Sequence, residues 1–143
     1  SDSDIRTLQD LTGKVVVVQS TTKPEELFLN AEQNGLPRLR RLYSLQNRDL
    51  LYTTLLKGYA DALAAHESAI RQFMKDYSVE YRILDEPLMT ARLGVAFAKG
   101  THAELSAALT QTLEQMQYEC TTGRILEKYG VDAQKAMGGD ENA

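Results

Sequence analysis

The chain has 143 residues, a net charge of −4 and a single cysteine, Cys120. This length suits one domain, or one domain with an appendage, and is enough to bury a substantial core. One cysteine excludes an intrachain disulfide and a cysteine-based metal cluster, and the acidic balance disfavours nucleic acid as a partner. No apolar run is long enough to cross a bilayer, and no secretory leader stands at Ser1. We therefore expect either a cytosolic protein or one whose leader has been removed.

The first predicted elements are a short helical turn over residues 5–11 and a strand made of four consecutive valines, residues 15–18. A β-branched run of this length without alternation predicts a central strand that is covered on both faces. Pro24 follows where the first turn of a helix tolerates proline, and Thr22 and Glu25 have the spacing of a capping box. A strand that turns into a helix this quickly presents unpaired backbone N–H groups. The sequence therefore predicts a site here for a carboxylate or another small anion.

Helices and strands alternate over the rest of the first hundred residues. Helices are predicted over residues 24–34, 47–57 and 68–75, and strands over residues 38–44, 60–65, 79–84 and 92–98. This alternation predicts an α/β fold with three layers, α/β/α, around a mostly parallel central sheet of about five strands. Ligands gather at the carboxyl ends of such strands. We therefore expect the loops at residues 20–22 and 66–68 to line one site.

After residue 100 the predicted elements are helices alone. An amphipathic helix is predicted over residues 103–117 and a shorter one over residues 123–129, and residues 138–143 are expected to form a disordered tail. The long helix has an apolar stripe on one face, formed by Leu105, Leu109, Leu113 and Met116. Such a stripe needs a cover, either from the rest of the chain or from a second copy, so we expect a homodimer or an exchange of strands and helices between copies.

Five segments in order resemble the periplasmic solute-binding proteins of the amino-acid type, two-lobed clamshells that serve ABC transporters. The matching segments are LQDLTGK at residues 8–14 with the valine strand, STT at 20–22, LKGYADA at 56–62, LGVAFAKG at 93–100 and TGRILEKYGVD at 122–132. The resemblance runs from Asp4 to Asp132. It implies that residues 5–99 form the second lobe, and that residues 100–137 are C-terminal helices that pack on a missing first lobe in the family.

The resemblance also implies which residues hold the ligand. In the family, the loop that matches Ser20, Thr21 and Thr22 holds the ligand carboxylate; Thr22 falls on the family threonine, and Thr21 falls where glycine is usual. The family's ammonium-binding aspartate corresponds to His66, followed directly by Glu67. A histidine cannot neutralise an ammonium as a carboxylate does, which counts against an ordinary α-amino acid. The predicted ligand-binding residues are Ser20, Thr21, Thr22, Lys23, His66 and Glu67.

Each of these residues has a structural alternative. The loop at residues 20–22 could cap a helix without binding a ligand, and Lys23 could be a solvated surface residue. His66 could be a ligand contact, a pH-sensitive latch or a simple loop residue, and Glu67 could serve as the substitute partner of a cation.

The sequence contains none of the glycine-rich, histidine or nucleophile motifs that mark enzymes. We therefore expect no enzymatic activity, no cofactor and no metal site, and the resemblance implies an extracytoplasmic or periplasmic solute-binding protein. It would capture a small carboxylate-bearing solute, such as an amino acid, for an ABC permease. Three alternatives stay open: a ligand-sensing domain of a membrane receptor or cell-wall enzyme with its own effector, a small dehydratase-like enzyme on the same fold, and a module that docks a protein partner.

Overall fold

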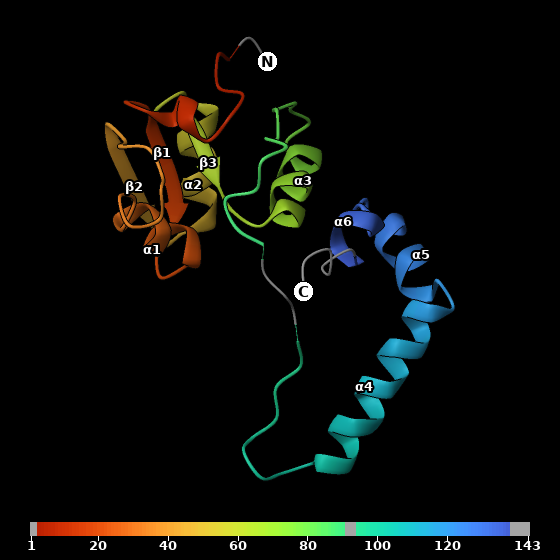
Figure 1. Ribbon diagram of the computed structural model, residues 1–143. Helices are drawn as coiled ribbons and strands as arrows, with labels where there is room; N and C mark the ends of the chain where they lie inside the picture. The colour runs from red at the N-terminus through yellow and green to blue at the C-terminus, as the bar shows by residue number, and fades with distance from the viewer. Residues whose placement is uncertain (1–2, 91–93, 138–143) are drawn as a thin grey trace. The chain divides into compact units, whose positions relative to one another are not determined.

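The computed structural model describes residues 3–90 and 94–137, which belong to two compact units that divide between Thr90 and Ala91. The first unit contains a parallel sheet and its helices, and the second contains helices alone (Figure 1). In chain order the first unit consists of a 3-10 turn (Gln9–Leu11), β1 (Val15–Gln19), α1 (Lys23–Leu29), β2 (Arg41–Leu45), α2 (Arg48–Leu56), β3 (Ala62–Ala64) and α3 (Glu67–Asp76). The second unit consists of α4 (Ala103–Tyr118), α5 (Thr121–Lys128) and α6 (Ala133–Met137).

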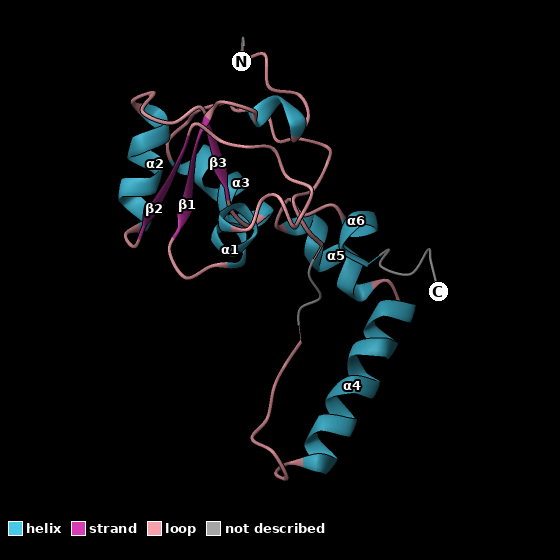
Figure 2. Cartoon of the chain, turned by 60° about the vertical axis from the view of Figure 1, so that its left-hand side comes forward, coloured by secondary structure: helices cyan, strands magenta, loops and turns pink. Residues whose placement is uncertain are grey.

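Strand β1 is the centre of the sheet, as the valine run predicts. It pairs in parallel with β2 on one side and with β3 on the other, and Val17 faces Tyr43 and Leu63 in the register. Figure 2 shows the three strands side by side. All four valines are buried, so the prediction of a strand covered on both faces is confirmed.

The valines divide between two apolar clusters because successive side chains of a strand point to opposite faces. Val15 and Val17 pack with α2 and α3, where the buried side chains are Leu51, Tyr52, Ala60 and Phe73. Val16 and Val18 pack with α1 and the N-terminal segment, where the buried side chains are Ile5, Leu11 and Phe28. The first unit is therefore an α/β fold in which helices or turns cover both faces of a parallel sheet.

The prediction of about five strands is wrong for the residues that the structure describes, which form a three-stranded sheet. Residues 79–84 are irregular, although Val79 and Tyr81 pack on the α2 and α3 cluster and Leu84 packs on the opposite one. Their alternation reflects this packing on the two clusters; a strand also requires a neighbouring backbone with which to pair. Of the strand predicted over residues 92–98, residues 94–98 are not in a strand, and residues 92 and 93 lie outside the described part.

The helices agree better with the sequence. Asn47 caps α2, because its side chain accepts a hydrogen bond from the Asp49 N–H at 2.8 Å. Helix α1 ends earlier than predicted, at Leu29, because the side-chain amides of Asn30 and Asn34 donate to backbone carbonyls of the preceding turns. Such side-chain bonds compete with helical hydrogen bonds and favour a turn.

In the second unit, α4 and α5 match two predicted helices, and α6 was not predicted. Gly123 is buried where α5 meets α6, since a Cβ at this position would lie 3.3 Å from Met137 Cε. The predicted apolar stripe of α4 has Leu105 and Leu113 exposed, at 55% and 47%. The expected dimer stays a prediction.

Within the described residues, no helix has the length and apolar character that a membrane span requires. The expected tail, residues 138–143, lies outside them.

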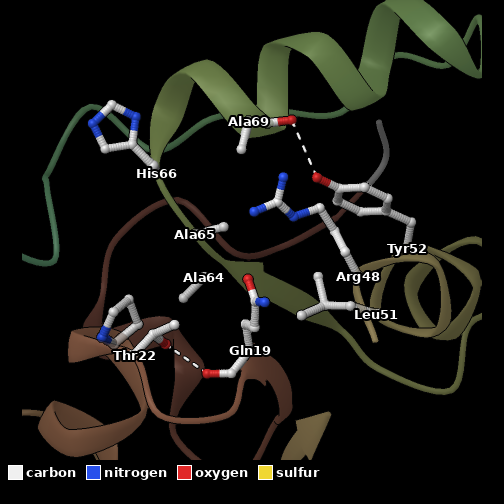
Figure 3. Close-up of a pocket in the computed structure, with 10 residues that line it drawn as sticks. Gln19, Thr22, Arg48, Leu51, Tyr52, Ala64, Ala65, His66 and Ala69 are labelled. Carbon is white, nitrogen blue, oxygen red and sulfur yellow. Dashed lines mark hydrogen bonds between the residues drawn. The ribbon is translucent and has the colours of Figure 1, made fainter. Parts of the chain in front are cut away.

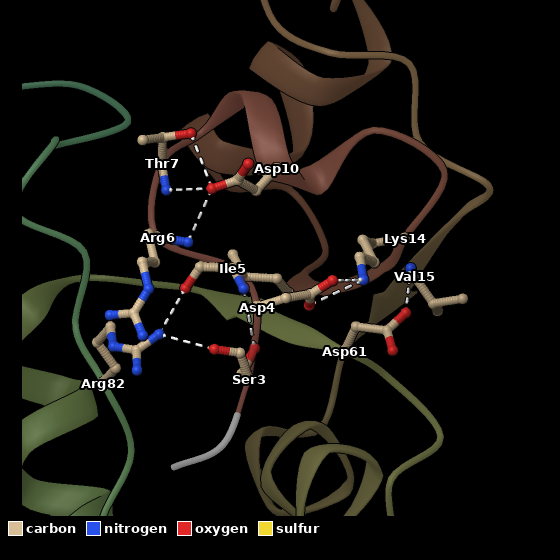
Figure 4. A network of polar contacts seen from close by, with 10 residues as sticks. All are labelled: Ser3, Asp4, Ile5, Arg6, Thr7, Asp10, Lys14, Val15, Asp61 and Arg82. Atoms are coloured by element: carbon tan, nitrogen blue, oxygen red, sulfur yellow. Dashed lines mark hydrogen bonds and ion pairs between the residues drawn. The ribbon is translucent and has the colours of Figure 1, made fainter.

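Polar contacts fix the N-terminal segment against the sheet (Figure 4). The Asp10 carboxylate accepts hydrogen bonds from the Arg6 and Thr7 N–H groups at 2.9 and 2.8 Å, and Lys14 Nζ lies 2.9 Å from the Asp4 carboxylate. The backbone N–H groups hold the pKa of Asp10 below its ordinary value, because they favour the ionised form. These contacts keep Ile5 in place over the second cluster.

Phe73 is the side chain whose removal should cost the first unit most. It is 1% exposed and stacks on Tyr52 with ring centroids 4.2 Å apart, so Phe73→Ala leaves a cavity between α3 and α2. We expect the free energy of unfolding in urea to fall by about 3–5 kcal/mol. The exposed neighbour variant Gln72→Ala should change it by less than about 0.5 kcal/mol. Equal losses in the two variants would contradict this account of the core.

The Asp10 contacts predict a pH dependence of stability. The pKa of Asp10 is lowered in the folded state, so its stabilising contribution is present above the unfolded pKa and is lost as pH falls through the folded pKa. We expect Asp10→Asn to be less stable than the parent chain near neutral pH, with the difference shrinking below pH 3.8, the ordinary pKa. Urea unfolding across the acid range measures this. Asp85→Asn is the control, and a difference independent of pH would contradict the prediction.

Candidate ligand-binding site

A pocket with a volume of about 200 Å³ lies at the carboxyl ends of β1 and β3 (Figure 3). Its walls come from the turn after β1, the start of α2, and the segment that joins β3 to α3. The lining residues are Gln19, Thr22, Pro24, Arg48, Leu51, Tyr52, Ala64, Ala65, His66 and Ala69. This volume is below the range of pockets for drug-sized ligands, so it suits a small molecule.

The parallel pairing of β1 with β3 brings two predicted residues together. Because the carboxyl ends of the two strands lie at one edge, Thr22 and His66 line the same pocket although they are distant in sequence. This edge is where parallel α/β sheets bind their ligands. That Thr22 and His66 themselves contact a ligand stays a prediction.

The capping box predicted for α1 does not form. The Thr22 hydroxyl donates to the Gln19 carbonyl at 2.5 Å instead of capping the helix. The Glu25 carboxylate accepts from the Thr21 N–H at 2.6 Å and from the Ser44 hydroxyl. One of the backbone N–H groups that were predicted to be unpaired, that of Thr21, therefore already donates to a carboxylate of the chain itself.

The other four predicted residues are not among those that line the pocket. The Ser20 N–H donates to the Leu45 carbonyl at 3.0 Å, and Thr21 is exposed. Lys23 forms an ion pair with Glu26 at 2.6 Å, and Glu67 forms one with Arg71 at 2.7 Å. Lys23 and Glu67 thus have partners of opposite charge within their own helices.

His66 is the N-cap of α3. Its Nδ1 accepts a hydrogen bond from the Ser68 N–H at 3.3 Å and lies 2.8 Å from the Ser68 hydroxyl. A ring nitrogen that accepts a hydrogen bond carries no proton, so the proton of the neutral imidazole belongs on Nε2. The cap therefore makes Nε2 a hydrogen-bond donor.

Arg48 is the pocket residue that the sequence analysis missed. It is the first residue of α2, and Figure 3 shows its side chain extending from that helix toward the pocket. It is exposed, and among the described residues its guanidinium makes no hydrogen bond or ion pair with another side chain. The rule that ligands gather at the carboxyl ends of strands would have identified it, because β2 ends at Leu45, three residues earlier.

Tyr52 and Leu51 give the pocket a buried apolar wall. The Tyr52 hydroxyl donates to the Ala69 carbonyl at 3.4 Å, and burial raises the pKa of this hydroxyl, so it is neutral at physiological pH. No carboxylate or thiol belongs to the described lining, and the described residues contain no cluster of metal-ligating side chains. The arrangement suits binding through hydrogen-bond donors.

Thr21 holds a left-handed backbone, with φ 59°, at the turn that enters α1. This conformation costs a β-branched residue about 1–2 kcal/mol, and glycine adopts it freely at an entropic cost of about 0.5–1 kcal/mol. We therefore expect Thr21→Gly to raise the free energy of unfolding in urea by roughly 0.5 kcal/mol. Both Thr21 and Thr22 donate their hydroxyls to backbone carbonyls, of Ser20 at 2.7 Å and of Gln19 at 2.5 Å. The control is Thr22→Gly, which loses the same kind of hydrogen bond at φ −112°, where no strain is relieved, so stability should fall. A loss of stability in both variants would argue against backbone strain at Thr21.

Comparison with known proteins gives structural neighbours only, since no family model and no curated protein matches the chain. One solved structure, described as the substrate binding protein of an amino acid ABC transporter, has a TM-score of 0.62 and 23% sequence identity. It is matched over 90% of this chain and 55% of its own. Another is the second substrate binding domain assigned to an amino acid ABC transporter from Streptococcus pneumoniae Canada MDR_19A. Its TM-score is 0.60 and its identity 22%, over 90% of this chain and 56% of its own.

At this level of identity the similarity shows a shared fold. The chain spans about 55% of the length of these solved structures. The resemblance to part of a solute-binding protein is therefore confirmed as a resemblance of fold, and the parallel sheet of the first unit belongs to that fold.

Proposed function

We propose that this chain is part of an extracytoplasmic solute-binding protein that captures a small carboxylate-bearing solute, such as an amino acid, for uptake by an ABC transporter. The observation that carries this proposal is the pocket at the carboxyl ends of β1 and β3, where Thr22 and His66 lie on walls from separate loops. The fold of the two structural neighbours supports it.

The mechanism we propose is capture without chemistry. The solute enters the pocket of this lobe, and a complementary lobe closes over it and supplies the remaining contacts, so that ligand binding shifts the protein toward its closed state. Residues 5–99 would form the binding lobe, and residues 100–137 would pack on its complement. The closed form would then deliver the solute to a permease.

Ligand binding should stabilise the protein against heat. A solute at one hundred times its dissociation constant adds about 2.7 kcal/mol, which raises the Tm of a domain of this size by several degrees. The experiment is a thermal-shift screen of amino acids and small carboxylates, on the 143-residue chain and on the natural full-length protein. We expect at least one compound to raise the Tm of the full-length protein. Failure of every compound to do so would overturn the proposal.

The two histidines provide a matched pair of variants for this screen. His66→Asn removes the imidazole from the pocket wall while asparagine, a strong N-cap residue, can still accept the Ser68 N–H. His102→Asn makes the same exchange in the second unit, where asparagine tolerates the left-handed backbone at φ 54°. We expect the ligand-induced shift to shrink in His66→Asn and to persist in His102→Asn. Equal shifts in both variants would place the ligand away from His66.

A further inference from the structure

We infer that the solute of this pocket is a small organic acid without an ammonium group, recognised through Arg48, and not a zwitterionic α-amino acid. This inference rests on the proposed function and narrows its class of ligand. It begins from the pocket that contains Arg48 and His66 on two different walls, one from α2 and one from the start of α3.

The charge of the described lining is positive. Arg48 brings a permanent cation with up to five N–H donors in a planar fork that matches a carboxylate. The other lining residues contribute no carboxylate to the described part of the pocket. An anion entering this pocket meets an opposite charge, and an ammonium meets a like charge.

Three carboxylates are adjacent in sequence to lining residues but are not part of the described lining: Glu25, Asp49 and Glu67. Asp49 is exposed, and the other two have partners within the chain. Glu25, one residue after Pro24, accepts hydrogen bonds from the Thr21 N–H and the Ser44 hydroxyl. Glu67, one residue after His66, is paired with Arg71 at 2.7 Å. Using Glu67 to neutralise an ammonium would break an ion pair that the helix already makes. The alternative of Glu67 as a substitute cation partner is therefore disfavoured by this geometry.

His66 leaves an ammonium without a ring acceptor at this wall of the pocket. Its Nδ1 already accepts from the Ser68 N–H, and the other ring nitrogen of the neutral imidazole carries the proton. The N-cap of α3 therefore uses the one acceptor that this side chain has.

The test compares acids that differ only in the amino group: propionate with alanine, succinate with aspartate, and glutarate with glutamate. Affinities are measured by titration calorimetry on the full-length protein. We expect at least one acid without the amino group to bind more tightly than its amino partner by about tenfold or more. Both bring a carboxylate to Arg48, but only the amino acid also brings an ammonium that meets a like charge and no acceptor.

Arg48→Gln should weaken binding of the preferred acid by about tenfold or more. The control is Arg41→Gln, which removes the same charge from the exposed first residue of β2, at the opposite end of the sheet. It should change the affinity by less than about twofold, because exposed charges at this distance are largely screened.

The outcomes separate this inference from the proposed function. Tighter binding of the amino acids, or an affinity that Arg48→Gln leaves unchanged, would overturn the inference while the solute-binding function stands. An absence of binding by all six acids and by the wider set of amino acids would overturn the proposed function itself. Selective loss in Arg48→Gln, together with a preference for the acid without an amino group, supports both.

Discussion

The first unit depends on the burial of four valines in one strand. Because β1 has partners on both sides and apolar side chains on both faces, it joins two clusters that would otherwise be separate. Burying a valine side chain stabilises a fold by about 1.5–3 kcal/mol, so this strand supplies a large share of the apolar contacts of a small unit. Its direction also decides which end of the sheet carries the pocket.

The sequence predicts what local patterns determine. The valine run and the Asn47 cap suffice for β1 and α2, since each depends on residues that are neighbours in the chain. The number of strands depends on backbone partners far away in sequence, and alternation in residues 79–84 does not carry that information. The apolar side chains of these residues pack on both clusters although their backbone does not join the sheet.

The binding site likewise combines features that follow from local sequence patterns with features that depend on distant parts of the chain. The predicted parallel direction of the strands was enough to place Thr22 and His66 at one edge of the sheet. The partner of Glu25 was not predictable, because one residue of difference in the turn moves its carboxylate from Thr22 to Thr21 and because Ser44 reaches it from β2. Arg48 has no motif of its own, and the signal that could have found it was its position just after the carboxyl end of β2.

The hydrogen bonds of Glu25 have a consequence for how a solute would be received. They connect the turn after β1 to the end of β2 and hold it in shape by contacts within the chain. A turn that is already fixed in this way loses little conformational freedom when a ligand binds. The entropic penalty of association then falls mainly on the incoming molecule and on the motion of whichever domain closes over it.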